Sequence, residues 1–252
     1  MIRRTLIGLA LLACASPAAA QGTVQFFPRY DFHLGAEHLS QADPRFVWDA
    51  NFGGEMDFVD YGVGRTTFVA NYEAVLGEQL RAFDPNQGNY RLDLSSSVRT
   101  HGYEIAALLH HTSRHLSDRF KRIPVDWNMF GAAVGHDIRR GTIVIRPRGD
   151  LLGVLLTSNV DYRWEANGGV DVEVPVQPHI SVIADANLRL VGVDGSRDRG
   201  TQTGSRVESG VRFEGTRGAI ELFVAGERRI DAYPLETSSL SWLSAGFRFV
   251  SR

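Results

Sequence analysis

The fold is decided by one stretch near the end of the chain, Leu240-Ser241-Trp242-Leu243-Ser244-Ala245-Gly246-Phe247-Arg248-Phe249-Val250. Within it, apolar and polar or small residues alternate: Leu243, Ala245, Phe247 and Phe249 against Ser244, Gly246 and Arg248. Successive side chains of a β-strand point to opposite faces, so this strand has one apolar and one polar face. An apolar face toward lipid and a polar face toward a wet interior are typical of a transmembrane β-barrel.

The same alternation recurs along the chain. In the first example, residues 30, 32, 34 and 36 are apolar, while the residues between them are Asp31, His33, Gly35 and Glu37. The pattern predicts further strands at 46–58, 65–76 and 90–99, from 103 onward, and near 127–138, 151–164, 169–175, 179–193, 205–214, 219–229 and 240–250. Residues 141–149 are either a strand of their own or part of a bent neighbour.

The lengths of the connections support a barrel independently of hydropathy. Short links at 60–64, 100–102, 175–178 and 215–218 alternate with longer, polar links at 77–89, 114–126, 194–203 and 229–239. Outer-membrane barrels have short periplasmic turns, long outer loops and an even number of strands. We therefore predict an all-β fold, a transmembrane antiparallel β-barrel of about 12 strands, with 10 or 14 as alternatives. A soluble β-sandwich or lipocalin-like barrel also alternates, but its charged face would leave many buried charges unpaired.

The first twenty residues have the features of a secretory signal. Arg3 and Arg4 precede an apolar stretch at 6–13, and the small residues 18–20 follow it. The sequence predicts a signal peptide at 1–20 and a single barrel domain at 21–252. A second interpretation takes Leu11-Leu12-Ala13-Cys14 as a lipoprotein cleavage site, with Cys14 lipidated.

Composition limits the partners of the chain. There are 27 Lys and Arg against 29 Asp and Glu, and one Cys. This balance excludes nucleic acid as an expected partner, and cleavage after Ala20 removes Cys14 and with it any disulfide. We expect a place in the cell outer membrane of a Gram-negative bacterium, contact with outer-membrane lipid and lipopolysaccharide, and recognition of the aromatic C-terminus by the barrel-assembly machinery. No organic cofactor and no metal is expected.

The densest group of reactive side chains lies at 110–118, His-His-Thr-Ser-Arg-His-Leu-Ser-Asp. Counting in twos from Tyr103 puts His111 and Ser113 on the outward face of one strand. A histidine beside a serine can activate its hydroxyl as a nucleophile. Asn128 of the next strand falls on the same outward face and can orient the imidazole, like the third member of a triad.

His111-Thr112-Ser113 resembles the His-x-Ser of outer-membrane phospholipase A and lipid A deacylase barrels, whose histidine and serine lie on the outer wall near the outer leaflet. The resemblance implies a lipid-active serine hydrolase with Ser113 as nucleophile, His111 as base and Asn128 as orienting residue. In those families an asparagine usually follows the serine, whereas Arg114 follows it here.

The longer stretch 111–120 is similar to a family of proteobacterial barrels of unassigned function, whose shared motif is roughly His-x-Ser-Ser-His-Leu-Gly-Asp-Glu. The sequence departs from that motif at Arg114, Ser117 and Arg119. This resemblance implies a barrel of about this size and indicates no substrate.

Several structural interpretations compete with a hydrolase. His115 can pair with Asp118, and Arg114 and Lys121 can bind lipopolysaccharide phosphates. A metal site of His110, His111, His115 and Asp118 would need a bend, because adjacent histidines of a strand point apart. A lumen lined by His33, Glu37, His38, Glu55, Asp57, Arg65, Arg91 and Arg99 is expected to be an ion network. From sequence alone, the leading hypothesis is a non-enzymatic barrel with a structural, surface or minor small-solute role, and the alternative is the lipid hydrolase.

The alternation in the last strand predicts that Phe249→Asp blocks assembly. The substitution places a carboxylate on the lipid-facing side, which costs up to a few kcal/mol depending on depth, and it removes the terminal aromatic residue. The variant should fail to show the faster gel mobility of an unheated, folded barrel. Normal assembly would mean that the face or the signal is wrongly assigned.

Overall fold

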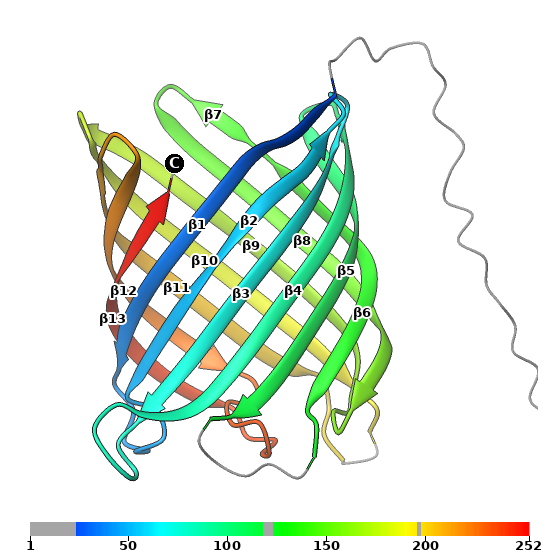
Figure 1. Ribbon diagram of the computed structural model, residues 1–252, viewed down its shortest axis with the longest axis vertical. Helices are drawn as coiled ribbons and strands as arrows, with labels where there is room; N and C mark the ends of the chain where they lie inside the picture. The colour runs from blue at the N-terminus through cyan, green and yellow to red at the C-terminus, as the bar shows by residue number, and fades with distance from the viewer. Residues whose placement is uncertain (1–23, 118–122, 196–197, 252) are drawn as a thin grey trace, which may run out of the picture.

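The computed structural model describes residues 24–117, 123–195 and 198–251, which form a closed antiparallel β-barrel (Figure 1). Consecutive strands pair from β1 to β6 and from β7 to β13, β1 pairs with β13, and β6 pairs directly with β8, past the short β7. The strands are β1 (Gln25–Leu39), β2 (Trp48–Asp60), β3 (Arg65–Gly77), β4 (Asp84–Thr100), β5 (Tyr103–Leu116), β6 (Asp126–His136), β7 (Ile138–Arg140), β8 (Ile143–Ser158), β9 (Tyr162–Gln177), β10 (Ile180–Val193), β11 (Gln202–Glu214), β12 (Gly218–Arg229) and β13 (Leu240–Ser251).

The predicted barrel of 12 strands is confirmed, because β7 only extends a hairpin with the first residues of β8. The ambiguous segment 141–149 belongs mostly to β8. The strand predicted at 151–164 is wrong, since the chain turns between Ser158 and Tyr162 through Asn159, whose φ is 56°. β4 begins at Asp84, before the predicted 90, because its polar first residues continue the pairing with β3.

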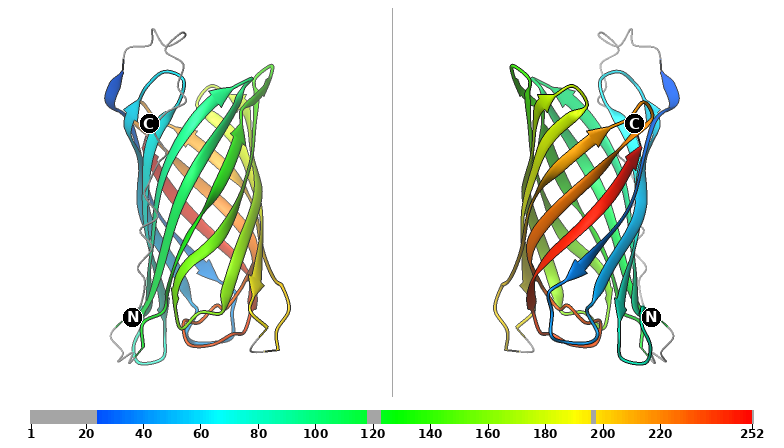
Figure 2. Two further views of the ribbon diagram at one scale, coloured as in Figure 1. Left: turned by 90° about the vertical axis from the view of Figure 1, so that its right-hand side faces the viewer. Right: turned by 90° about the vertical axis from the view of Figure 1, so that its left-hand side faces the viewer.

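The two ends of the barrel differ. β1 begins and β13 ends at one end, which we call the terminal end, and the connections there are short: 61–64, 101–102, 178–179 and 215–217. At 101–102, His101 and Gly102 have φ values of 50° and 82°, as a two-residue hairpin turn requires. The opposite, loop end carries the longer connections, including 40–47, 78–83, 194–201 and 230–239. Figure 2 shows the strands tilted around the wall between these ends.

The outer wall is apolar. In β13 the side chains of Leu243 and Phe249 are 69% and 44% exposed, while Ser244 between them is 7% exposed. A strand in hydrocarbon must pair every backbone polar group within the protein, which a closed barrel achieves. The outward apolar face therefore fits a membrane, as the alternation predicts. The described residues include no helix of the length and apolarity needed to cross a membrane.

The inner wall is a network of arginine and carboxylate side chains. Arg206 of β11 contacts Glu37 of β1 at 2.9 Å, and it also contacts Glu208 and Glu227 at 2.8 and 3.0 Å. β11 and β1 are three places apart in the wall, so the Arg206 to Glu37 pair joins strands that are not neighbours. Arg229 of β12 likewise reaches Asp49 of β2 at 2.8 Å. Such pairs extend charged side chains into the lumen and narrow it.

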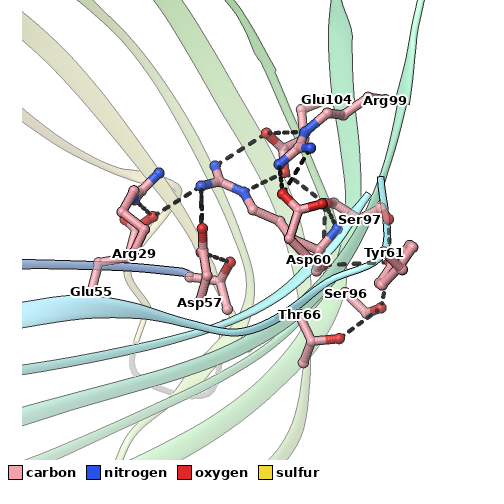
Figure 3. A network of polar contacts seen from close by, with 12 residues as sticks. Arg29, Glu55, Asp57, Asp60, Tyr61, Thr66, Ser96, Ser97, Arg99 and Glu104 are labelled. Carbon is pink, nitrogen blue, oxygen red and sulfur yellow. Dashed lines mark hydrogen bonds and ion pairs between the residues drawn. The ribbon is translucent and has the colours of Figure 1, made fainter. Parts of the chain in front are cut away.

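A second network lies toward the terminal end (Figure 3). Arg65 contacts Asp57 at 3.1 Å and Glu104 at 2.7 Å, and Arg99 contacts Asp60 at 3.0 Å. The predicted ion network is confirmed in these contacts. His38 does not belong to it: it lies on the same outward face as Leu34, and its ring packs edge-on against Trp48 with 5.1 Å between centroids.

The loop end of the lumen is filled by apolar side chains. One buried cluster consists of Leu108, Trp127, Met129, Leu152, Tyr162, Val191 and Ile230. A second consists of Leu39, Phe46, Val75, Ala232 and Trp242. The segment 230–232 contributes to both clusters, so the connection after β12 folds into the mouth of the barrel. Between this plug and the terminal end lies a cavity of about 840 Å³ with a mostly polar and charged lining.

The contacts of Arg206 predict that Arg206→Leu destabilises the folded barrel. Glu37 would lose its arginine partner, whereas Glu208 and Glu227 would keep their contacts with Arg248 and Arg229. Breaking a fully buried pair costs about 3–5 kcal/mol, and because lumen water screens this site we expect about 2–3 kcal/mol. The urea concentration at which the folded gel band disappears should fall.

Arg163→Leu is the matched control, because the side chain of Arg163 is 65% exposed and contacts Asp194 at 3.2 Å. Exposed pairs contribute about 0–1 kcal/mol. Equal urea midpoints for the two variants would contradict the role assigned to Arg206.

Candidate functional site

β5 carries reactive side chains on both of its faces. Leu109 is 46% exposed on the outer wall, whereas Leu108 and His110 are buried on the inner side. The alternation places His111, Ser113 and His115 on the outward face with Leu109, and it places Thr112 and Arg114 inside with His110. The predicted outward placement of His111 and Ser113 agrees with the structure.

His111 and Asn128 are brought together on the outer wall. They are register partners between β5 and β6, and Nδ1 of His111 lies 2.9 Å from Oδ1 of Asn128. Asn128 faces outward with Phe130, while Trp127 and Met129 on either side of it are buried inside. The contact between His111 and Asn128 is the one that the orienting role requires.

Ser113 makes its hydrogen bond to a different histidine. Its Oγ lies 2.8 Å from Nε2 of His115, the next outward residue of β5. The hydrogen bond from Ser113 to His111 that a triad would show is replaced in this structure by the bond to His115. Ser113 therefore lies between two imidazoles, one of which is held by Asn128.

Aromatic and aliphatic side chains surround these three residues on the outer wall. Rings of Phe52, Tyr72, Tyr90 and His115 follow one another across β2 to β5, with centroid distances of 5.3, 4.8 and 5.6 Å. On the other side, the pairing of Asn128 is followed by a bulge in β8 that exposes both Leu155 and Leu156, by 58% and 70%. Bulges often occur beside functional sites, and this one widens the apolar surface next to Asn128.

The inward face of β5 holds a second polar cluster, which the alternation of the sequence did not reveal. Nδ1 of His110 lies 2.6 Å from Oδ1 of Asp93, and Nε2 lies 2.9 Å from Oγ1 of Thr112. Asp93 is the register partner of His110 on β4. The alternation already placed Asp93 inside, but finding the contact required the register between the two strands.

The structure also separates the histidines that a metal site would need. His110 points into the lumen and His111 points outward, so they cannot share an ion. The described residues contain no group of three or more His, Cys, Asp or Glu side chains placed to hold a metal. Asp118, the fourth ligand of that hypothesis, lies outside the described residues.

Arg114, the residue at which the motif departs from the lipolytic barrels, is buried inside the mouth. Its guanidinium donates to the backbone oxygens of Asp231 and Ala232 at 2.5 and 2.9 Å. Asp231 also accepts from the hydroxyl of Tyr162 at 2.8 Å and from Arg199 at 2.9 Å. Arg114 thus fixes the segment 230–232 and does not reach the outward site.

The outer rim of the mouth is held by Arg45. It contacts Asp43 at 2.7 Å and Glu236 at 2.6 Å, which joins the 40–47 connection to the 230–239 connection. The side-chain hydrogen bond from Arg45 lowers the pKa of Asp43 below its ordinary value. Because the pKa is lower in the folded state, the stability from this contact is present near neutral pH and is lost as the pH falls through that lowered pKa.

Among known proteins, the chain is similar in fold to outer-membrane barrels. An active-site variant of outer membrane phospholipase A from Escherichia coli, with asparagine changed to alanine, matches at a TM-score of 0.54 and 10% identity, over 95% of this chain and 94% of that chain. The phospholipase of Salmonella typhi, described as a dimer with bound calcium, matches with the same values. LpxR from Salmonella typhimurium matches at a TM-score of 0.48 and 9% identity, over 87% and 99% of the two chains.

No protein family profile and no curated protein sequence matches the chain. The TM-score of 0.54 shows a shared fold with the phospholipases, and an identity of 10% does not transfer an activity.

The contacts of Arg114 predict that Arg114→Ala loosens the plug. Each hydrogen bond from a charged donor contributes about 1.5–3 kcal/mol, so losing even one should raise the population of the opened 230–239 connection about tenfold or more. Cleavage within 230–239 by an added protease should accelerate accordingly in the folded barrel. Arg163→Ala, at the same end but exposed, is the control, and equal cleavage of both variants would contradict the anchoring role.

Proposed function

We propose that this outer-membrane β-barrel protein hydrolyses acyl esters of membrane lipids at its outer wall, with Ser113 as nucleophile, His111 as base and Asn128 as orienting residue. The observation that carries the proposal is the 2.9 Å contact between His111 and Asn128, two residues from Ser113 on the same face. The sequence alone favours a non-enzymatic barrel. This contact moves our preference to the hydrolase.

The contact with Asn128 sets the tautomer of a neutral His111. An amide oxygen only accepts hydrogen bonds, so Nδ1 of a neutral His111 carries the proton. Nε2 is then the unprotonated nitrogen, which is the form that can take a proton from a hydroxyl. Orienting the ring in this way is the role of the third member of a serine triad.

Ser113 reaches the base by a small movement. Its hydroxyl is bonded to His115 in the resting structure, and rotation about χ1 moves it between staggered positions. Catalytic hydrogen bonds are often formed only when substrate is bound. Oγ of Ser113 then attacks the ester carbonyl carbon as its proton passes to Nε2 of His111, which protonates the leaving alcohol. Water releases the acyl group from Ser113 by the reverse roles.

The surroundings of the site favour a lipid as substrate. Leu109, Phe130 and Leu156 are 46%, 43% and 70% exposed beside it on the outer wall. The site lies near the loop end, which in barrels of this kind faces the cell exterior. Acyl esters of phospholipid or of lipid A in the outer leaflet would therefore meet Ser113 without entering the lumen.

An assay of fatty-acid release from phospholipid and lipid A vesicles tests the proposal. Ser113→Ala should abolish release, and His111→Ala should lower the rate by about 10²–10⁴, the usual contribution of a general base. Asn128→Ala should lower the rate of release by a smaller factor. The double variant at 111 and 113 should lower the rate little more than Ser113→Ala alone. The assay is run with and without calcium, because the Salmonella typhi phospholipase is described with bound calcium.

Ser96→Ala is the control, because Ser96 is another outward hydroxyl, bonded to the hydroxyl of Tyr61 at 3.2 Å toward the other end of the barrel. The Ser96→Ala variant should release fatty acid at the wild-type rate. Folded wild-type protein that releases no fatty acid from either lipid would return the assignment to a non-enzymatic barrel. A larger loss for His115→Ala than for His111→Ala would contradict the choice of His111 as base.

A further inference from the structure

We propose that Thr112, His110 and Asp93 form a second nucleophilic site inside the lumen, which hydrolyses small, water-soluble anionic esters. This inference does not depend on the outer-wall site, because the two sites share no residue and face opposite sides of β5. It rests on three features: a relay of hydrogen bonds, a cavity beside it, and a guanidinium next to the hydroxyl.

The relay has the order that nucleophilic catalysis needs. The carboxylate of Asp93 lies 2.6 Å from Nδ1 of His110, so this nitrogen donates its proton to the carboxylate. Nε2 of His110 is then the acceptor for the hydroxyl of Thr112, at 2.9 Å. Carboxylate, imidazole and hydroxyl thus follow one another as in a triad, which is recognised by geometry and roles and does not depend on the order of the residues in the chain.

The relay is sheltered but borders an open space. Asp93 and His110 are 5% and 9% exposed. Both residues and Thr112 line the cavity of about 840 Å³, a size typical of small-molecule sites. The hydroxyl can therefore meet a ligand, while the imidazole and carboxylate behind it are fixed.

An imidazole is unusual in this wall. Elsewhere the lumen carboxylates are matched mainly by arginine, as at Arg206 and Arg229. A guanidinium keeps its proton at any physiological pH, whereas an imidazole exchanges one near neutrality. A structural ion pair at Asp93 needs only Arg91, which already contacts it at 2.7 Å. Asp93 already has Arg91 as its ion-pair partner, so His110 is not needed for charge pairing. Its imidazole can instead accept and release a proton.

Arg91 also sets the class of ligand. It is the register partner of Thr112 on β4, and it binds Asp93 through Nε and Nη2. Its side chain is 56% exposed to the lumen, so it can bind a carboxylate or phosphate group, or the oxyanion that forms during acyl transfer. Most residues that line the cavity are polar or charged, and Arg91 faces it, so a small anionic ester suits this site better than a long acyl chain.

The reaction balances with water as the only other reactant. Oγ1 of Thr112 forms a bond to the ester carbonyl carbon, and its proton passes to Nε2 of His110. The carbon–oxygen bond to the alcohol breaks as His110 returns that proton to the leaving oxygen. His110 then takes a proton from water, whose oxygen attacks the acyl-threonine, and the acid and the free Thr112 hydroxyl are regenerated.

Full-length folded barrel carrying Ser113→Ala provides the test, because that change removes the outer-wall nucleophile. The probe is mono-4-nitrophenyl succinate, and the readouts are nitrophenol release and the mass of the peptide containing Thr112 after acid quenching. We expect turnover and a succinyl group on Thr112. Adding Thr112→Val, which keeps the shape, should remove the acyl-peptide and lower the rate at least about 10²-fold, whereas Thr112→Ser should retain both.

Asp93→Asn should lower the rate about 10²-fold or more while the gel mobility of the folded barrel is unchanged, because the wrong imidazole tautomer would face Thr112. Acylation at another residue, or equal rates for the Thr112→Val and Thr112→Ser variants, would overturn the proposal. So would folded protein that neither releases nitrophenol nor carries the acyl group. These results are independent of the lipid assay, in which Thr112→Val should behave as wild type.

Discussion

The structure depends on one constraint: in hydrocarbon, a backbone polar group must find its hydrogen bond within the protein. The chain meets it by pairing β1 with β13 and by pairing β6 with β8 past the short β7, so that the wall has no open edge. Closure makes the alternation strict. Every strand residue faces either lipid or lumen, and each face imposes its own chemistry. The hydrocarbon side takes Leu, Phe and Tyr, and the lumen side takes arginine and carboxylate in contact with one another.

The same division explains Arg114. In the lipolytic barrels that the motif resembles, an asparagine usually follows the serine. The residue after an outward-facing serine points inward, so Arg114 points into the lumen. Arg114 accordingly binds the backbone of Asp231 and Ala232 in the mouth. The presence of Arg114 in place of asparagine thus affects how the lumen is plugged. It does not change the outward surroundings of Ser113, which consist of His111, His115 and Asn128.

The alternation was sufficient to predict the barrel, the number of its strands and the outward phase of His111, Ser113 and Asn128. It failed where strands are polar or where the chain turns without a clear breaker, as at the start of β4 and between Ser158 and Tyr162. The alternation could not predict contacts that depend on the register between strands or on a side-chain rotamer. Asp93 meets His110 only because β4 and β5 pair in one particular register, and the bond of Ser113 to His115 reflects one of several rotamers. Nothing in the composition of 230–239 indicated that this connection folds into the mouth.

β5 also separates the lipid outside the barrel from the aqueous lumen, by the thickness of a single strand. On one side it presents an imidazole and a hydroxyl to lipid, and on the other side it presents the same two groups to an aqueous cavity. A strand that slips by one residue exchanges its faces. A single inserted residue ahead of Leu109 would therefore carry the histidine bonded to Asn128 into the lumen and expose the partner of Asp93 to hydrocarbon. Substitutions in this segment leave its two faces in place. An insertion or deletion does so only when it involves an even number of residues.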